Sequence, residues 1–372
     1  MSDPNTSPGY RIFGSPHRYL QGPAALEALP TWSDQLGGRP LFITDAFAWS
    51  LVHPRLLNAY AGNGNAEAQL TYVGFSGEIT HQSIRENVEK SAPHAPSVII
   101  AIGGGKALDM GKAVSHALGC PVITVPTIAS TDAPTSNSFA IYNDAHRLIS
   151  VERMSRNPYL VLVDTSIIAR APERFLRAGI GDAIAKKFEG EAAFHAGANS
   201  SHKTRPLRIG LSIGDFCYQT IRTFSAEALV AVELGQTSQA LENVVEACIL
   251  GSGLGFENTG LSIAHAMTRG LMASPETRQA MHGEHVAYGL IIQLLLENRP
   301  ANFMDDLLKF YEDIGLPRSL AQLGQTSAIT PEIIDGIVLP TLDAPHITNA
   351  PIPISKSRMI VAIETLERRS VQ

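Results

Sequence analysis

The sequence has little cysteine, no excess of positive charge and no long apolar run. Its three cysteines, Cys120, Cys217 and Cys248, show no CxxC or zinc-finger spacing, so we expect buried, reduced thiols. The net charge is −6 and both signs are mixed along the chain, which argues against nucleic acid or an anionic membrane as a partner. The apolar runs fall short of the roughly 18 residues that span a bilayer. Residues 1–19 lack the apolar core of a secretory signal, so a cytoplasmic protein is expected.

The first 165 residues alternate between short β-rich runs and helical patterns. The expected strands are 40–44, 68–75, 96–103, 120–127 and 159–164, and the expected helices include 80–92 and 106–118. This alternation predicts a parallel sheet with crossover helices. After residue 165 the β-rich runs stop and long helical patterns take over. The fold class is therefore α/β plus all-α, with an α/β domain over residues 1–165 and an all-helical domain over 166–372.

Three glycines follow an apolar run in the stretch IAIGGGKALDMGKAVSH, residues 100–116, which suggests a phosphate-binding turn. Walker A fits badly because Ala113 occupies the position of the hydroxyl residue that reaches Mg²⁺. The Rossmann fingerprint fails because Leu108 stands at its third glycine and the turn does not follow the first strand. These failures argue against nucleotide hydrolysis.

A glycine turn between a strand and a helix can still bind an anion. Gly104 and Gly105 let backbone N–H groups approach a phosphate at the positive end of the helix, and Lys106 adds a charge there. Asp109 is placed to fix the loop, and Lys112 is expected to be a solvated helix residue. The competing interpretation is a tight turn without a ligand.

A polar loop follows the next expected strand, and ligands of open α/β sheets bind at such strand ends. Ser, Thr and Asp are also ordinary turn residues, so the loop alone is a weak signal. Its polar residues are Thr127, Ser130, Thr131, Asp132, Thr135, Ser136 and Ser138.

The helical half holds candidate metal ligands. His265 and His282 each lie in a stretch of small residues that permits close approach, and Asp182 is expected at or near a helix start, where capping would also explain it. One aspartate and two histidines leave a coordination position open, as in catalytic zinc sites. Three other histidines remain open as rivals: His195, His202 and His285.

Five stretches, taken together and in order, resemble the glycerol dehydrogenases of the metal-dependent, so-called iron-containing, alcohol dehydrogenase superfamily. They are GGGKALDMGKA, VPTIASTDAPTS, NPYLVLVDTSIIARAPERFLRAGIGDA, GSGLGFENTGLSIAHAM and HGEHVAYG. The resemblance spans roughly residues 10 to 365. It implies a dehydroquinate synthase-like fold, with an N-terminal dinucleotide-binding domain, a C-terminal metal-binding helical domain, and a homo-oligomer.

The resemblance also implies site residues. Asp182, His265 and His282 would bind Zn²⁺, and Asp132 would hydrogen-bond the polyol substrate. The implied NAD contacts are Asp45, Gly104, Gly105, Lys106, Asp109, Thr127, Ser130, Ser136, Ser138 and Tyr142. Ser138 stands where the family often has leucine, a change that a backbone contact would survive. A carboxylate at Asp45 would disfavour the 2′-phosphate of NADP.

One departure separates the branches of the superfamily. The iron-binding branch carries a histidine four residues after the aspartate, and Lys186 stands there in this sequence. Three protein ligands fit the zinc branch better.

The implied reaction is NAD-dependent oxidation of a small polyol to a ketone, of the type glycerol to dihydroxyacetone. Another vicinal diol or a 2-hydroxycarboxylate remains an alternative substrate, although Asp132 would repel a carboxylate. A dehydroquinate synthase-like lyase and a glycerol-1-phosphate dehydrogenase are less favoured, because the expected site segments carry few basic groups for a phosphate. A dinucleotide sensor without activity is disfavoured because all three ligand positions match.

Overall fold

The chain forms two compact units in the computed structural model, which describes residues 9–63, 70–143 and 148–370. The sheet unit comprises Ser15–Pro172 and Val230–Leu250, and the helical unit comprises Glu173–Leu229 and Gly251–Gln372 together with residues 9–14. These units differ in three places from the division predicted after residue 165, the first being that residues 9–14 belong to the helical unit. The chain leaves the sheet unit at residue 172, and the segment 230–250 returns to it because it packs against the first strand and a short helix of that unit.

The sheet unit is built on a six-stranded sheet in which every pair of neighbouring strands is parallel. Its order is β1-β8-β5-β4-β2-β3. The strands are β1 (Arg18–Gly22), β2 (Pro40–Thr44), β3 (Tyr72–Gly74), β4 (Val98–Gly103), β5 (Val122–Pro126) and β8 (Leu160–Asp164). A separate antiparallel hairpin joins β6 (Ser138–Tyr142) to β7 (Leu148–Arg153).

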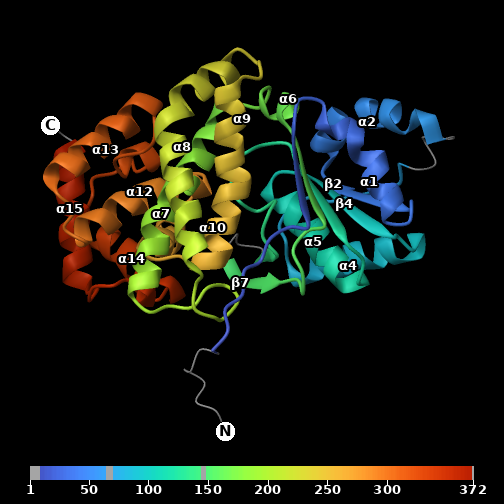
Figure 1. The fold of residues 1–372 in the computed structure, drawn as a ribbon. Coiled ribbons are helices and arrows are strands. Elements are labelled where there is room, and N and C mark those ends of the chain that lie inside the picture. The colour runs from blue at the N-terminus through green and yellow to red at the C-terminus, as the bar shows by residue number, and fades with distance from the viewer. Residues whose placement is uncertain (1–8, 64–69, 144–147, 371–372) are drawn as a thin grey trace, which may run out of the picture. The chain divides into compact units, whose positions relative to one another are not determined.

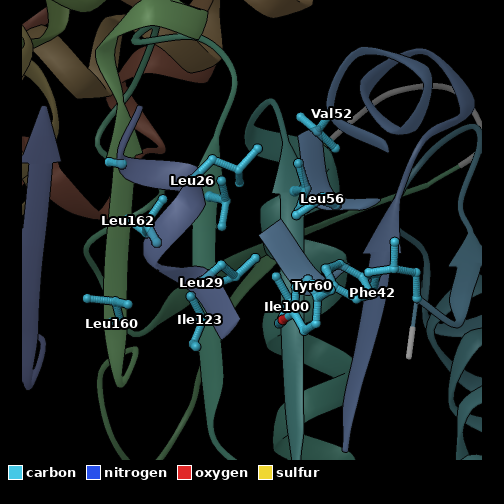
Figure 2. Close-up of a cluster of buried hydrophobic side chains, with 14 of the residues drawn as sticks. Leu26, Leu29, Phe42, Val52, Leu56, Tyr60, Ile100, Ile123, Leu160 and Leu162 are labelled. Atoms are coloured by element: carbon cyan, nitrogen blue, oxygen red, sulfur yellow. The ribbon is translucent and has the colours of Figure 1, made fainter. Parts of the chain in front are cut away.

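Consecutive residues of a strand point to opposite faces of a sheet. Apolar side chains of the buried strands therefore lie on both faces of this sheet, and helices cover each face. Phe42 and Ile100 face one layer and lie beside Tyr60, as Figure 2 shows. The sequence neighbours of Phe42 and Ile100 belong to a second buried cluster on the other face. The helices of the unit are α1 (Leu29–Gln35), α2 (Ala46–Tyr60), α4 (His81–Ser91), α5 (Gly105–Leu118), α6 (Thr165–Ile168) and α9 (Gln239–Glu246), with 3-10 turns η1 (Ala25–Ala28), η2 (Ala61–Asn63) and η3 (Ala92–His94) (Figure 1).

The helical unit is centred on α7, α11 and α12, which pack against one another. Its helices are α7 (Glu173–His195), α10 (Ser252–Thr259), α11 (Ile263–Ala273), α12 (His282–Leu296), α13 (Ala301–Ile314), α14 (Pro331–Leu342) and α15 (Lys356–Ser370), with η5 (Ala321–Leu323) and η6 (Pro345–Asn349). Most of α8 (Arg208–Glu233) also belongs to it, and the π-helical turn η4 (Ala247–Gly251) leads from α9 into α10. Among the described residues, no helix is both long and apolar enough to span a membrane.

The fold class predicted from the sequence is confirmed. The expected strands at 40–44, 96–103, 120–127 and 159–164 match observed strands within two residues at each end. The expected strand 68–75 is observed only as β3, and its first two residues lie outside the described part of the chain. Cys217 and Cys248 are buried and form no disulfide within the described part of the chain, as expected, whereas Cys120 is half-buried.

Candidate metal and cofactor sites

One face of α7 carries three buried ionisable residues. Asp182, Lys186 and Glu189 follow one another at i, i+4 and i+7, so they share a side of the helix, and each is at most 2% exposed. Asp182 lies near the middle of α7, nine residues after its first residue Glu173, and not at a helix start. The expected position at or near a helix start is therefore wrong, and helix capping does not explain this aspartate.

Two histidines from other helices meet Asp182. His265 comes from the first turn of α11, and His282 is the first residue of α12. The Nε2 atoms of His265 and His282 lie 3.3 Å and 4.0 Å from Asp182 Oδ1. One potential ligand atom from each of the three residues lies within 4.8 Å of the others. The structure therefore brings together the three residues that the resemblance implied.

Close helix packing fixes this meeting point. A Cβ added to Gly283 would lie 1.7 Å from the carbonyl oxygen of Ala178, so α12 touches α7 directly beside His282. A Cβ on Gly289 would lie 2.5 Å from the carbonyl oxygen of Ala264, so α12 also touches α11 directly beside His265. The small residues beside the histidines thus permit the close approach of the helices that the sequence analysis expected.

The carboxylate of Asp182 remains ionised in this buried place. Burial alone raises the pKa of Asp182, but the Lys186 ammonium and the hydrogen bond with His265 outweigh it and hold that pKa well below its usual value. Lys186 Nζ donates to Asp182 Oδ1 at 2.7 Å. Asp182 Oδ2 is buried and has no hydrogen-bond donor within the described part of the chain. A buried carboxylate oxygen without a donor fits a metal ligand.

Glu189 orients His265 and was missed in the sequence analysis. Its Oε2 lies 2.5 Å from His265 Nδ1, and its Oε1 accepts the backbone N–H groups of Ser262 and His265 at 2.8 Å and 2.9 Å. Burial raises the pKa of Glu189, but the nearby His265 and Lys186 outweigh this effect and hold that pKa below its usual value. The group is therefore anionic. A carboxylate behind a histidine fixes the ring and leaves Nε2 for a metal. The helical spacing from Asp182 was the signal that could have revealed it.

The rival histidines lie elsewhere. His285 is buried and its Nε2 lies 2.9 Å from the carbonyl oxygen of Thr277. Burial lowers the pKa of His285, so its ring is neutral there. His195 is exposed at the end of α7, and His202 lies in the following loop. Within the described residues, neither joins a group of three possible ligands.

The glycine turn of the sheet unit has the predicted geometry. β4 ends at Gly103, Gly104 is the N-cap of α5, and Gly105 begins that helix. No side chain caps the helix, so its first backbone N–H groups are available to a ligand. Gly103 has φ +138, a conformation that favours glycine, and a Cβ there would lie 3.3 Å from Asp45 Oδ2.

The two lysines that follow this turn, Lys106 and Lys112, differ in burial and in hydrogen-bond partners. Lys106 is exposed and its Nζ lies 2.6 Å from Glu78 Oε1. Lys112 is fully buried, so the expectation of a solvated residue is wrong. Its ammonium donates to Asp109 Oδ1 at 3.1 Å, to the Ser138 carbonyl at 2.7 Å and to the Ala133 carbonyl. Lys112 therefore ties α5 to the polar loop.

Asp109 acts on the same loop. Its Oδ2 accepts the backbone N–H of Ala140 at 3.0 Å, which holds β6 against α5. Burial, together with the carboxylates of Asp109 and Glu78, raises the pKa of Tyr142 to about 12, so its hydroxyl stays protonated as a hydrogen-bond donor.

The remaining predicted residues lie at the carboxyl ends of the strands. Asp45 directly follows β2 and caps α2 by accepting the N–H of Ala48 at 2.9 Å. The polar loop between β5 and β6 buries the candidate cofactor contacts and leaves Asp132 half-buried. Those contacts are Thr127, Ser130, Ser136 and Ser138.

Comparison with known proteins agrees with this geometry. Residues 16–165 match the model of the family described as iron-containing alcohol dehydrogenase. The glycerol dehydrogenase of Citrobacter freundii is 34% identical over 357 residues, which cover 96% of this chain and 97% of that protein. The chain belongs to the iron-containing alcohol dehydrogenase family. It is an alcohol oxidoreductase.

Two other relatives bear on the fold and the substrate. The glycolaldehyde reductase of Halobacterium salinarum is 35% identical over 324 residues, covering 87% of each chain. The crystal structure of glycerol dehydrogenase from Schizosaccharomyces pombe superposes with a TM-score of 0.91 at 31% identity, covering 98% of this chain and 92% of that one. The resemblance and the fold predicted from the sequence are confirmed in this family.

Proposed function

We propose that this alcohol oxidoreductase catalyses the NAD-dependent oxidation of a small polyol, of the type glycerol to dihydroxyacetone, with Zn²⁺ held by Asp182, His265 and His282. The observation that carries the proposal is the convergence of these three side chains, of which Asp182 has a buried oxygen without a donor among the described residues. The overall reaction converts a secondary alcohol and NAD⁺ into a ketone, NADH and a proton.

The metal would supply Lewis-acid chemistry, which polarises a substrate hydroxyl and lowers its pKa. The protein's own contribution is orientation. Glu189 holds the His265 ring with Nε2 directed at Asp182, and helix packing sets the positions of both histidines. His282 is 43% exposed, so the open side of the group lies at this residue and a substrate can approach there.

The sheet unit would bind the dinucleotide. The uncapped N-terminus of α5 at Gly104 and Gly105 suits a pyrophosphate, and the Asp45 carboxylate at the end of β2 favours the free ribose hydroxyls of NAD over NADP. Asp132 is our candidate for holding a second hydroxyl of the substrate.

The substrate could also be another vicinal diol, because one relative is named a glycolaldehyde reductase. NADH formation should be followed with glycerol, propane-1,2-diol, ethylene glycol and a 2-hydroxy acid, before and after treatment with a chelator. We expect turnover of a diol, loss of that activity with the chelator, and recovery with added Zn²⁺. Turnover of the hydroxy acid alone would overturn the substrate assignment.

His282→Ala tests the metal ligands in the same assay. We expect a loss of at least about a hundredfold in kcat, because Lewis-acid stabilisation contributes several kcal/mol to the barrier. His195→Ala is the matched control, since that histidine is exposed at the end of α7. Full activity of His282→Ala that also resists the chelator would contradict the assignment of His282 as a metal ligand.

A further inference from the structure

Lys186 is a buried cation among the candidate metal ligands. Its side chain is 1% exposed, and its Nζ lies 2.7 Å from Asp182 Oδ1 and 3.2 Å from His265 Nε2. A metal bound to these two atoms would lie about 2 Å from each of them. The ammonium therefore overlaps with the volume that the ion needs.

The helix geometry keeps the lysine there. Lys186 follows Asp182 by four residues on the same face of α7, and its Cβ lies 3.5 Å from the position of a Cβ on Gly255. The lysine stem therefore lies at ordinary contact distance from Gly255 of α10. The Nζ also lies 6.0 Å from the centre of the Phe256 ring.

The net charge of the site with a bound divalent ion depends on whether the Lys186 ammonium is present. Asp182 pairs with Lys186, and Glu189 pairs with His265, so two buried carboxylates act on the candidate ligands. Together they balance a divalent ion completely, whereas a divalent ion beside the Lys186 ammonium leaves one positive charge in excess. Like charges at this distance in a buried site repel strongly.

We propose that Lys186 is a built-in competitor of the metal: its ammonium pairs with Asp182 in the metal-free protein, is displaced when a divalent ion binds, and thereby lowers the affinity of the site for that ion. This inference rests on the metal site of the proposed function. It predicts a protein that stays folded without metal, because its buried carboxylate keeps a counter-charge.

The test is metal affinity, measured on the full-length chain after a chelator has been dialysed away. Co²⁺ binding is followed by visible absorption, and Zn²⁺ binding by competition with a chromogenic indicator. Lys186→Met and Lys186→Gln should bind both ions at least about tenfold more tightly than the original chain. The glutamine variant retains a donor for Asp182 and serves if the methionine variant does not fold.

Lys187→Gln is the matched control. This neighbour on α7 is 22% exposed and pairs with Glu191 and Asp215 rather than with the candidate ligands, so metal affinity should not change. Thermal unfolding adds a second readout: Lys186→Met should melt at a lower temperature than the original chain without metal, and saturating Zn²⁺ should raise its melting temperature more.

The outcomes separate the two hypotheses. Equal or weaker binding by both Lys186 variants, while the original chain binds Zn²⁺ and His282→Ala does not, would overturn the role of Lys186 and leave the metal site standing. If neither the original chain nor the variants bind Zn²⁺ or Co²⁺, the metal site of the proposed function fails and the inference fails with it.

Discussion

Each unit of the chain buries a lysine beside an aspartate of the same helix, and the two pairs differ in what else the ammonium reaches. Besides their contact with each other, Lys112 and Asp109 on α5 form hydrogen bonds with backbone groups of the polar loop and β6. Lys186 instead lies beside an imidazole nitrogen, and Asp182 keeps one oxygen without a donor within the described chain. A buried pair that is satisfied by backbone holds structure together, whereas a buried pair with an unsatisfied atom marks a place for a ligand.

The largest effect that tests this comparison is expected from Lys112→Met. The change leaves the Asp109 carboxylate and two loop carbonyls without their buried cation. Breaking such a pair costs about 3–5 kcal/mol in the free energy of unfolding. Urea denaturation measures this, with Lys90→Met, an exposed lysine of α4, as the control. Stability close to that of the original chain would remove Lys112 from its structural role.

Gly283→Ala tests whether helix packing sets the metal site. The added Cβ would lie 1.7 Å from the Ala178 carbonyl oxygen, so α7 and α12 must move apart. We expect a loss of about 1–3 kcal/mol in stability and weaker Zn²⁺ binding, because His282 moves away from Asp182.

Gly336→Ala is the matched control for this change. Gly336 is exposed within α14 and an added Cβ would meet nothing within 4 Å. This substitution should raise stability by about 0.4–1 kcal/mol and leave Zn²⁺ affinity unchanged. If both variants bind Zn²⁺ like the original chain, the packing at Gly283 does not position the ligands.

Gly105→Ala should have the smallest effect on stability while separating the two sites. The nearest atoms to an added Cβ are Thr131 Oγ1 at 3.7 Å and Ala133 Cβ at 3.9 Å, which is ordinary contact. The melting temperature should therefore stay unchanged. The methyl group should nevertheless keep a phosphate away from the helix N-terminus and weaken NAD binding about tenfold. Calorimetric titration with NAD⁺ measures this, and unaltered NAD⁺ affinity would show that the turn does not hold the dinucleotide.

The sheet unit was largely predictable because its signals are local. A buried strand such as β4 and the glycine turn after it are encoded by adjacent residues, so strand, turn and helix follow from the stretch 96–118. The β6–β7 hairpin was not predicted, because β7 is mostly exposed and lacks the continuous buried apolar run of strands such as β2 and β8. Lys112 was misjudged because its burial depends on the loop 133–138, which folds back over α5.

The helical site shows the limit of such reasoning. Residue types and the family resemblance suggested Asp182, His265 and His282, but local sequence left rival histidines open. The spacing from Asp182 places Glu189 and Lys186 on one side of α7, but their contacts with His265 required the packing of α7 against α11, since these contacts join residues 76 to 79 positions apart.

The sequence by itself determined most strands of the parallel sheet, the helices between them and the glycine turn, because these depend on periodicity and on neighbouring residues. The family followed from the resemblance of five stretches to known sequences. Only the tertiary structure decided which histidines meet Asp182, which lysine is a structural clamp and which one faces the metal ligands. Those outcomes depend on how closely helices approach at Gly283 and Gly289, and that approach is set by packing between distant segments.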